Sequence, residues 1–161
     1  QTLRTETREF FHKNNIRYIR TGNWRVRFHT DNLDDVRDWC RISGLHFSYD
    51  AKTDVVTSEY VTSAVPVDQR GDVVFCNSIL PVLWQEDEGH DKSLVRLENG
   101  LPIPEEIVRE IRDVTKRNRV LVKMRQNDVI WVDNTRALHG RMEFDDPDRN
   151  VGVRMGRHIS W

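Results

Sequence analysis

The sequence has few cysteines, no long apolar run and almost no net charge. Its two cysteines, Cys40 and Cys76, lie too far apart for a Cys-x-x-Cys site and are too few for the disulfide framework of a secreted domain. We expect reduced, half-buried thiols. No apolar run approaches the roughly 20 residues that cross a bilayer, and no basic-then-apolar leader opens the chain. A soluble, cytoplasmic protein without a membrane partner is therefore expected.

The charge balance excludes a further class of partner. The 25 Lys and Arg residues nearly equal the 26 Asp and Glu residues, so the net charge is −1 and no strong field attracts nucleic acid. At 161 residues the chain is long enough for one domain with its own core. Residue 1 is Gln rather than Met, so we expect a processed chain or a part of a longer gene product.

Residues 1–70 are expected to form helices and a hairpin. The best-signalled helix there has Leu33, Val36 and Cys40 at helical spacing, with Gly44 where a left-handed C-terminal cap is expected. The expected elements are an amphipathic helix within 2–14, a strand over 16–19, the helix that begins after Asp31 or Asn32, and a hairpin of strands 45–49 and 55–61.

Residues 71–161 are expected to supply core strands and one further helix. Pro104 opens that helix, 104–117, because its fixed φ suits a first turn and two glutamates follow it. The polar segment 85–100 is expected to be a long surface loop of the kind that often acts as a lid. The expected strands are 73–76, 119–124, 129–132, 137–142 and 150–159.

The stretch from Asn134 to Arg141, followed by Arg149, carries the strongest chemical signal. Non-haem Fe(II) oxygenases hold iron with two histidines and one carboxylate, and His139 is a candidate for one of them. A guanidinium fork binds a carboxylate bidentately, which suits Arg149 to a dicarboxylic acid. If adjacent strands bear His139 and Arg149, iron and 2-oxoglutarate would lie side by side.

His29 and Asp31 are a competing source of metal ligands. Two residues apart on a strand, they would point to the same face and could complete a triad with His139. Asp31 also stands at the start of an expected helix, where a capping aspartate is common. Both interpretations stay open at this point.

Residues 126–155 resemble the C-terminal signature of the taurine dioxygenase superfamily of Fe(II)/2-oxoglutarate oxygenases. That signature is Gly-Asp-x-x-x-x-Asp-Asn-x-x-x-x-His-Gly-Arg followed by an arginine, and Asn127 here replaces the usual glycine. The chain resembles most the syringomycin-biosynthesis type of amino-acid hydroxylase. The similar segments are Phe10-Phe11 with Ile16–Arg20, Trp24 with Phe28–Asp31, the helix ending at Cys40, Phe75–Asn77, and Asn99–Ile103.

The resemblance implies a mainly β fold with added helices, namely a double-stranded β-helix (jelly-roll) oxygenase core that is incomplete in this chain. Residues 1–161 would be a single domain, the C-terminal part of the oxygenase, with a helix and hairpin insert in 1–70 and core strands in 71–161. The family's first two metal ligands would precede Gln1, which argues against His29 and Asp31.

The resemblance also implies roles for individual residues. His139 resembles the distal iron ligand, and Arg149 resembles the arginine that pairs with the far carboxylate of 2-oxoglutarate. Arg154 is a second cosubstrate candidate. Asn77 and Arg141 are candidates for substrate binding.

The implied activity is hydroxylation of an amino acid or a related small or carrier-bound substrate, of the kind found in secondary metabolism. The cofactors would be Fe(II), 2-oxoglutarate and O2, with succinate and CO2 as coproducts. The alternative from another class is a degenerate jelly roll that serves as a non-catalytic binding or scaffold domain. Substrate identity and oligomeric state do not follow from the signature.

Overall fold

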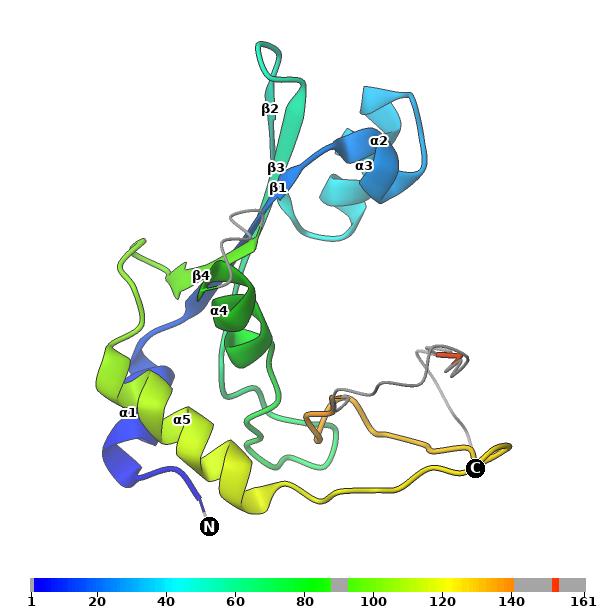
Figure 1. Cartoon of the computed structure of the whole chain (residues 1–161). Coiled ribbons are helices and arrows are strands. Elements are labelled where there is room, and N and C mark those ends of the chain that lie inside the picture. The colour runs from blue at the N-terminus through cyan, green and yellow to red at the C-terminus, as the bar shows by residue number, and fades with distance from the viewer. Residues whose placement is uncertain (1, 88–92, 141–151, 154–161) are drawn as a thin grey trace.

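The computed structural model describes residues 2–87, 93–140 and 152–153, and its centre is one antiparallel sheet (Figure 1). The strand order is β2-β3-β1-β4, so β1 is a central strand with a partner on each edge. The strands are β1 (Ile16–Gly22), β2 (His46–Asp50), β3 (Val55–Thr62) and β4 (Ser93–Leu97).

The side chains of β1 alternate between a buried and a more polar face. Ile16 and Tyr18 are buried, and the Tyr18 ring stacks on that of its cross-strand neighbour Tyr60 with centroids 5.1 Å apart. Arg17, on the opposite face, pairs with Glu59 at 3.2 Å. This period of two is what a sheet covered on one face requires.

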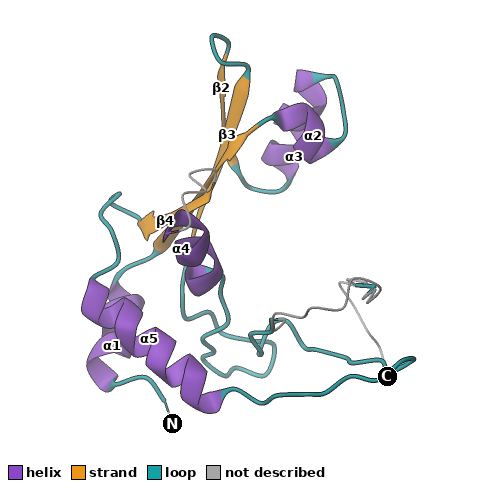
Figure 2. Cartoon of the chain, in the orientation of Figure 1, coloured by secondary structure: helices purple, strands orange, loops and turns teal. Residues whose placement is uncertain are grey.

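The helices form two groups along the sheet, each with its own hydrophobic cluster (Figure 2). Phe11, Val95 and Ile111 are among the residues that bring α1, β4 and α5 into the larger cluster. The smaller cluster, which joins Trp24, Val36, Cys40 and Val56, holds the α2–α3 pair against β3. The helices are α1 (Thr5–Lys13), α2 (Trp24–Phe28), α3 (Leu33–Ile42), α4 (Ile79–Asp87) and α5 (Glu105–Asn118). None of the helices in the described part of the chain is long and apolar enough to cross a bilayer.

Glu110 connects α5 to the start of α1. Its carboxylate accepts hydrogen bonds from the Arg4 backbone amide at 2.5 Å, Arg4 Nε at 2.8 Å and the Thr7 hydroxyl at 2.6 Å. The Glu110 side chain is 10% exposed. Burial opposes its charged form, but the donors of Thr7 and Arg4 and the Arg4 charge outweigh this, so the Glu110 pKa lies below its ordinary value.

Local signals in the sequence predicted much of this part correctly. The helices of residues 5–13, 33–42 and 105–118 and the β2–β3 hairpin are confirmed. Asn32 rather than Asp31 caps α3, because its side chain accepts the Asp34 amide hydrogen at 3.0 Å. Gly44 adopts φ 69°, the left-handed conformation expected after a helix.

The surface-loop prediction for residues 85–100 was wrong in part. Helix α4 extends to Asp87, and β4 pairs with β1 and buries Val95 and Leu97 on one face. Strand β4 was missed because it has only five residues and the residues around it are polar, which favours the prediction of a loop. The strand predicted over 73–76 is also absent: Val73 forms only an isolated bridge with Val67.

Residues 119–132 are extended around one turn, and the strands predicted over 119–124 and 129–132 did not form; of the strand predicted over 137–142, the described residues 137–140 are not a strand either. Only the turn is as expected, with Asn127 at φ 71° and the Asp128 amide donating to the Arg125 carbonyl. A strand requires a hydrogen-bonded neighbour, and no described segment pairs with this one. Its apolar side chains, such as Val120 and Trp131, stay exposed. The described residues are thus mixed α and β around a four-stranded antiparallel sheet, and they do not confirm the expected jelly roll. The strand expected over 150–159 lies almost wholly outside the described residues.

Candidate functional site

The segment before His139 folds into a compact turn that begins at Asp133. Asp133 Oδ1 accepts hydrogen bonds from the Thr135 amide at 3.0 Å and the Thr135 hydroxyl at 2.6 Å. The Asp133 carbonyl accepts from the amides of Arg136 and Ala137. The Thr135 donors lower the pKa of Asp133, so its carboxylate stays charged and holds the turn.

Arg136 leaves this turn and binds a second loop, residues 66–74. Its guanidinium forms an ion pair with Asp68 and lies 3.1 Å from Asp72 through both terminal nitrogens. The Asp68 side chain is only 3% exposed, whereas that of Asp72 is 59% exposed. Residues more than 60 positions apart are therefore joined by a charge-assisted contact.

The loop that receives Arg136 is itself built around Asp68. Its Oδ1 accepts the amide hydrogens of Arg70 and Asp72, each at 2.9 Å, and Gly71 supplies the left-handed residue of the turn at φ 84°. Burial opposes the charge of Asp68, but these amides and the Arg136 charge outweigh it, so the Asp68 pKa lies below its ordinary value. The loop therefore presents a charged carboxylate to Arg136.

Cys76 provides a second link between the same two segments. Its thiol donates to the Asn134 carbonyl at 3.1 Å. Burial raises the Cys76 pKa, and the nearby Asp133 charge raises it further, which favours the protonated thiol that this contact needs. Cys40 is also a free thiol, but it is fully buried rather than half-buried as expected.

Asn77 follows Cys76 directly, so it lies next to the contact between Cys76 and the Asp133 turn. Its amide nitrogen donates to the Ala64 carbonyl at 3.2 Å, and its amide oxygen accepts from the Ile79 amide at 3.1 Å. Both polar groups thus hold the start of α4. A role in substrate binding stays a prediction, and it would require the amide to share these contacts.

His139 stands three residues beyond Arg136, and its side chain is exposed. The segment that contains the candidate metal ligand is therefore held by the Asp133 turn and by its contacts to residues 68–76 (Figure 1). Arg141, Arg149 and Arg154 lie outside the described residues, so their predicted roles are untested.

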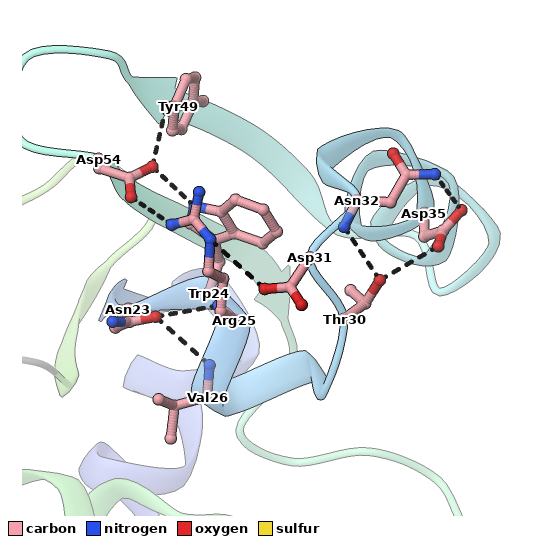
Figure 3. Close-up of polar contacts among 10 residues, drawn as sticks. All are labelled: Asn23, Trp24, Arg25, Val26, Thr30, Asp31, Asn32, Asp35, Tyr49 and Asp54. Atoms are coloured by element: carbon pink, nitrogen blue, oxygen red, sulfur yellow. Dashed lines mark hydrogen bonds and ion pairs between the residues drawn. The ribbon is translucent and has the colours of Figure 1, made fainter.

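His29 and Asp31 do not form the second half of a metal site. They lie between α2 and α3, not on a strand, and His29 ends α2 in the left-handed conformation at φ 54°. In Figure 3, Asp31 points toward Arg25, whose Nε lies 3.7 Å from it. The α2–α3 pair also lies far from residues 119–140 in Figure 1. The expected alternative of a compact triad with His139 is therefore wrong.

The polar cluster around Arg25 has a structural explanation instead. The Asp54 carboxylate accepts hydrogen bonds from Trp24 Nε1 at 3.1 Å and the Tyr49 hydroxyl at 2.9 Å, and it pairs with Arg25 (Figure 3). The Arg25 guanidinium also lies 4.1 Å from the centroid of the Trp24 ring. These contacts attach α2 to the β2–β3 turn.

The described residues supply histidines that could bind iron, but they do not bring a set of three ligands together. An exposed imidazole such as that of His139 fits Fe(II). Among residues 2–87, 93–140 and 152–153, however, no group of three or more His, Cys, Asp or Glu side chains could hold a metal ion.

Comparison with known proteins decides the family. The family model described as taurine catabolism dioxygenase TauD, TfdA family matches residues 1–156. The chain belongs to this family. Members of the TauD/TfdA family are Fe(II)/2-oxoglutarate dioxygenases. A clavaminate synthase-like protein of Arabidopsis thaliana is 29% identical over 84 residues, which are 51% of this chain and 26% of that protein. No solved structure matches the chain. The chain thus spans about a quarter of the length of the curated relative that it matches.

The contacts of Arg136 are the part of the candidate site that sequence patterns did not predict. The available signals were an arginine inside the signature and two aspartates that flank Gly71 in a polar loop. Neither signal shows that the two segments meet, because turn chemistry is local and their pairing is not.

Proposed function

We propose that the protein is an Fe(II)/2-oxoglutarate-dependent dioxygenase that hydroxylates an amino acid or a related small or carrier-bound substrate. The observation that carries the proposal is the family match over residues 1–156, which includes the segment with His139. The Asp133 turn and its contact with Asp68 support the proposal, because a side chain that binds a metal must be held in place by its surroundings. The further ligands would come from outside the described residues.

In this proposal the candidate residues bind the metal, the cosubstrate or the substrate. Fe(II), with 2-oxoglutarate, would supply the activation of O2. His139 would bind the metal through its imidazole, and Arg149 would bind the far carboxylate of 2-oxoglutarate, with Arg154 as a second candidate. Asn77 and Arg141 would contact substrate. The resemblance of sequence segments to syringomycin-type hydroxylases motivates the amino-acid substrate.

The test is succinate formation by the full protein with Fe(II), 2-oxoglutarate, O2 and a panel of amino acids. We expect His139→Ala to lower succinate formation at least about a hundredfold, since even residues that merely orient a metal ligand cost 10- to 100-fold. His46→Ala removes an exposed histidine from β2 and should leave the rate unchanged. Equal rates for wild type and His139→Ala would rule out the metal role of His139.

Fe(II) titration separates this proposal from the scaffold alternative. A catalytic protein should bind Fe(II), and His139→Ala should weaken that binding. A full protein that binds no Fe(II) would instead support a non-catalytic binding or scaffold domain.

A further inference from the structure

The contact of Arg136 with Asp68 and Asp72 has features that set it apart from an ordinary surface ion pair. The Asp68 carboxylate is nearly inaccessible, and two backbone amides and one guanidinium satisfy it. Its loop is closed independently by the Val67–Val73 bridge and by the Val74 amide, which donates to the Pro66 carbonyl at 2.9 Å. Arg136 therefore binds a preformed acceptor, so little ordering is needed when the contact forms.

The contact also lies where it can affect chemistry. Arg136 is three residues from His139 in the chain, and Asp72 is five residues from Asn77. The thiol of Cys76 donates to the Asn134 carbonyl between the same segments, so the link has two points. Beyond this link, residues 119–132 are extended and expose most of their apolar side chains. Within the described chain, Arg136 supplies the ion pairs that fix this end of the segment.

We propose that Arg136 is a positioning residue: its ion pairs with Asp68 and Asp72 hold the segment that carries His139 against the loop that precedes Asn77. This inference rests on the proposed function for its consequence, which is a correctly placed metal ligand. The link itself is independent of that function, and the two parts can be measured separately.

The first measurement uses the thiol at the link. In the wild type, Cys76 is half-buried and hydrogen-bonded, and Cys40 is inaccessible. We expect Arg136→Gln to raise the rate at which Cys76 reacts with a thiol reagent such as DTNB by about an order of magnitude, the change that loss of a hydrogen bond to a charged group produces. Asp68→Asn should act in the same direction. Cys40 must stay unreactive, which excludes global unfolding.

The second measurement is Fe(II) affinity, determined by anaerobic calorimetry on the full protein. Arg136→Gln should weaken Fe(II) binding about 10- to 100-fold, as for other residues that orient a ligand. Arg136→Lys should recover most of this loss, because it keeps the charge although it lacks the two-pronged geometry. Arg125→Gln is the matched control, since it removes the same charge from an exposed position in the same segment and should change neither readout.

The outcomes separate the two proposals. Unchanged Cys76 reactivity in Arg136→Gln would show that Arg136 does not hold the segment. Faster Cys76 reaction with unchanged Fe(II) affinity would overturn the positioning role and leave the proposed function intact. A wild-type protein that binds no Fe(II) would refute the proposed function and the metal-related consequence of Arg136 with it.

Discussion

Replacement of Glu110 by Gln tests the contact that joins α5 to α1. The wild-type carboxylate accepts three hydrogen bonds within a side chain that is 10% exposed. Gln keeps the shape but carries one acceptor oxygen, so at least one donor from Arg4 or Thr7 loses its partner. Hydrogen bonds to charged groups contribute about 1.5–3 kcal/mol and neutral ones about 0.5–1.5 kcal/mol. We therefore expect Glu110→Gln to lower the free energy of unfolding by about 2–3 kcal/mol in urea titrations at pH 7.

The pH dependence of the same comparison is a stricter test. The pKa of Glu110 in the folded protein lies below 4.5, the ordinary value that the same side chain has in the unfolded chain. The carboxylate therefore contributes its full stability above pH 4.5 and loses it as the pH falls through the folded-state pKa. The difference between wild type and Glu110→Gln should shrink over that window.

The control for Glu110 is on the same helix. Glu105 has an 88% exposed side chain and lies 3.7 Å from Arg109 one turn away, a geometry that contributes only a few tenths of a kcal/mol. Glu105→Gln should therefore change the free energy of unfolding little at pH 7. If Glu110→Gln cost no more than Glu105→Gln, the proposed link between α1 and α5 would be refuted.

Two further substitutions test the core and a helix cap. Ile111→Ala removes a side chain that is 1% exposed and should lower the free energy of unfolding by about 2–5 kcal/mol in urea titrations. Ile42→Ala, at a 77% exposed position, should lower it much less. Equal losses would contradict the packing of α5. Asn32→Ala removes the cap of α3 and should cost about 0.5–2 kcal/mol by thermal unfolding. Asp31→Ala should leave the melting temperature nearly unchanged, and the reverse order would mean that Asp31 is the cap.

The sequence predicted the elements whose signals are local. The α3 helix was found from a cap at Asp31 or Asn32, from Gly44 and from three apolar residues at helical spacing, all within about a dozen positions. The same holds for the β2–β3 hairpin, whose turn residues Asp50–Asp54 are adjacent. These signals act within one element, so no knowledge of the rest of the fold was needed.

Features that depend on distant partners were not predicted correctly. Strand β4 was missed because its partner β1 lies far away in the chain, and its polar surroundings indicated a loop. Residues 119–124 and 129–132 have apolar patterns typical of strands, but a pattern cannot supply the neighbour that a strand pairs with. The candidate site shows the same limit: the signature points to His139 as a candidate ligand, whereas the acceptor for Arg136 lies in a loop more than 60 residues earlier.

The order of strands in the sheet also has a consequence for how the chain folds. The β2–β3 hairpin closes a turn of four residues, and such hairpins form within about 1–10 μs. The pairing of β1 with β4 must close a loop that contains α2, α3, the hairpin and α4, which costs more entropy and comes later. Until residues 93–97 arrive, one edge of β1 has unpaired backbone groups that another chain could bind. A ribosome releases β4 after β1, β2 and β3, so that interval sets the time during which this sheet is open to aggregation.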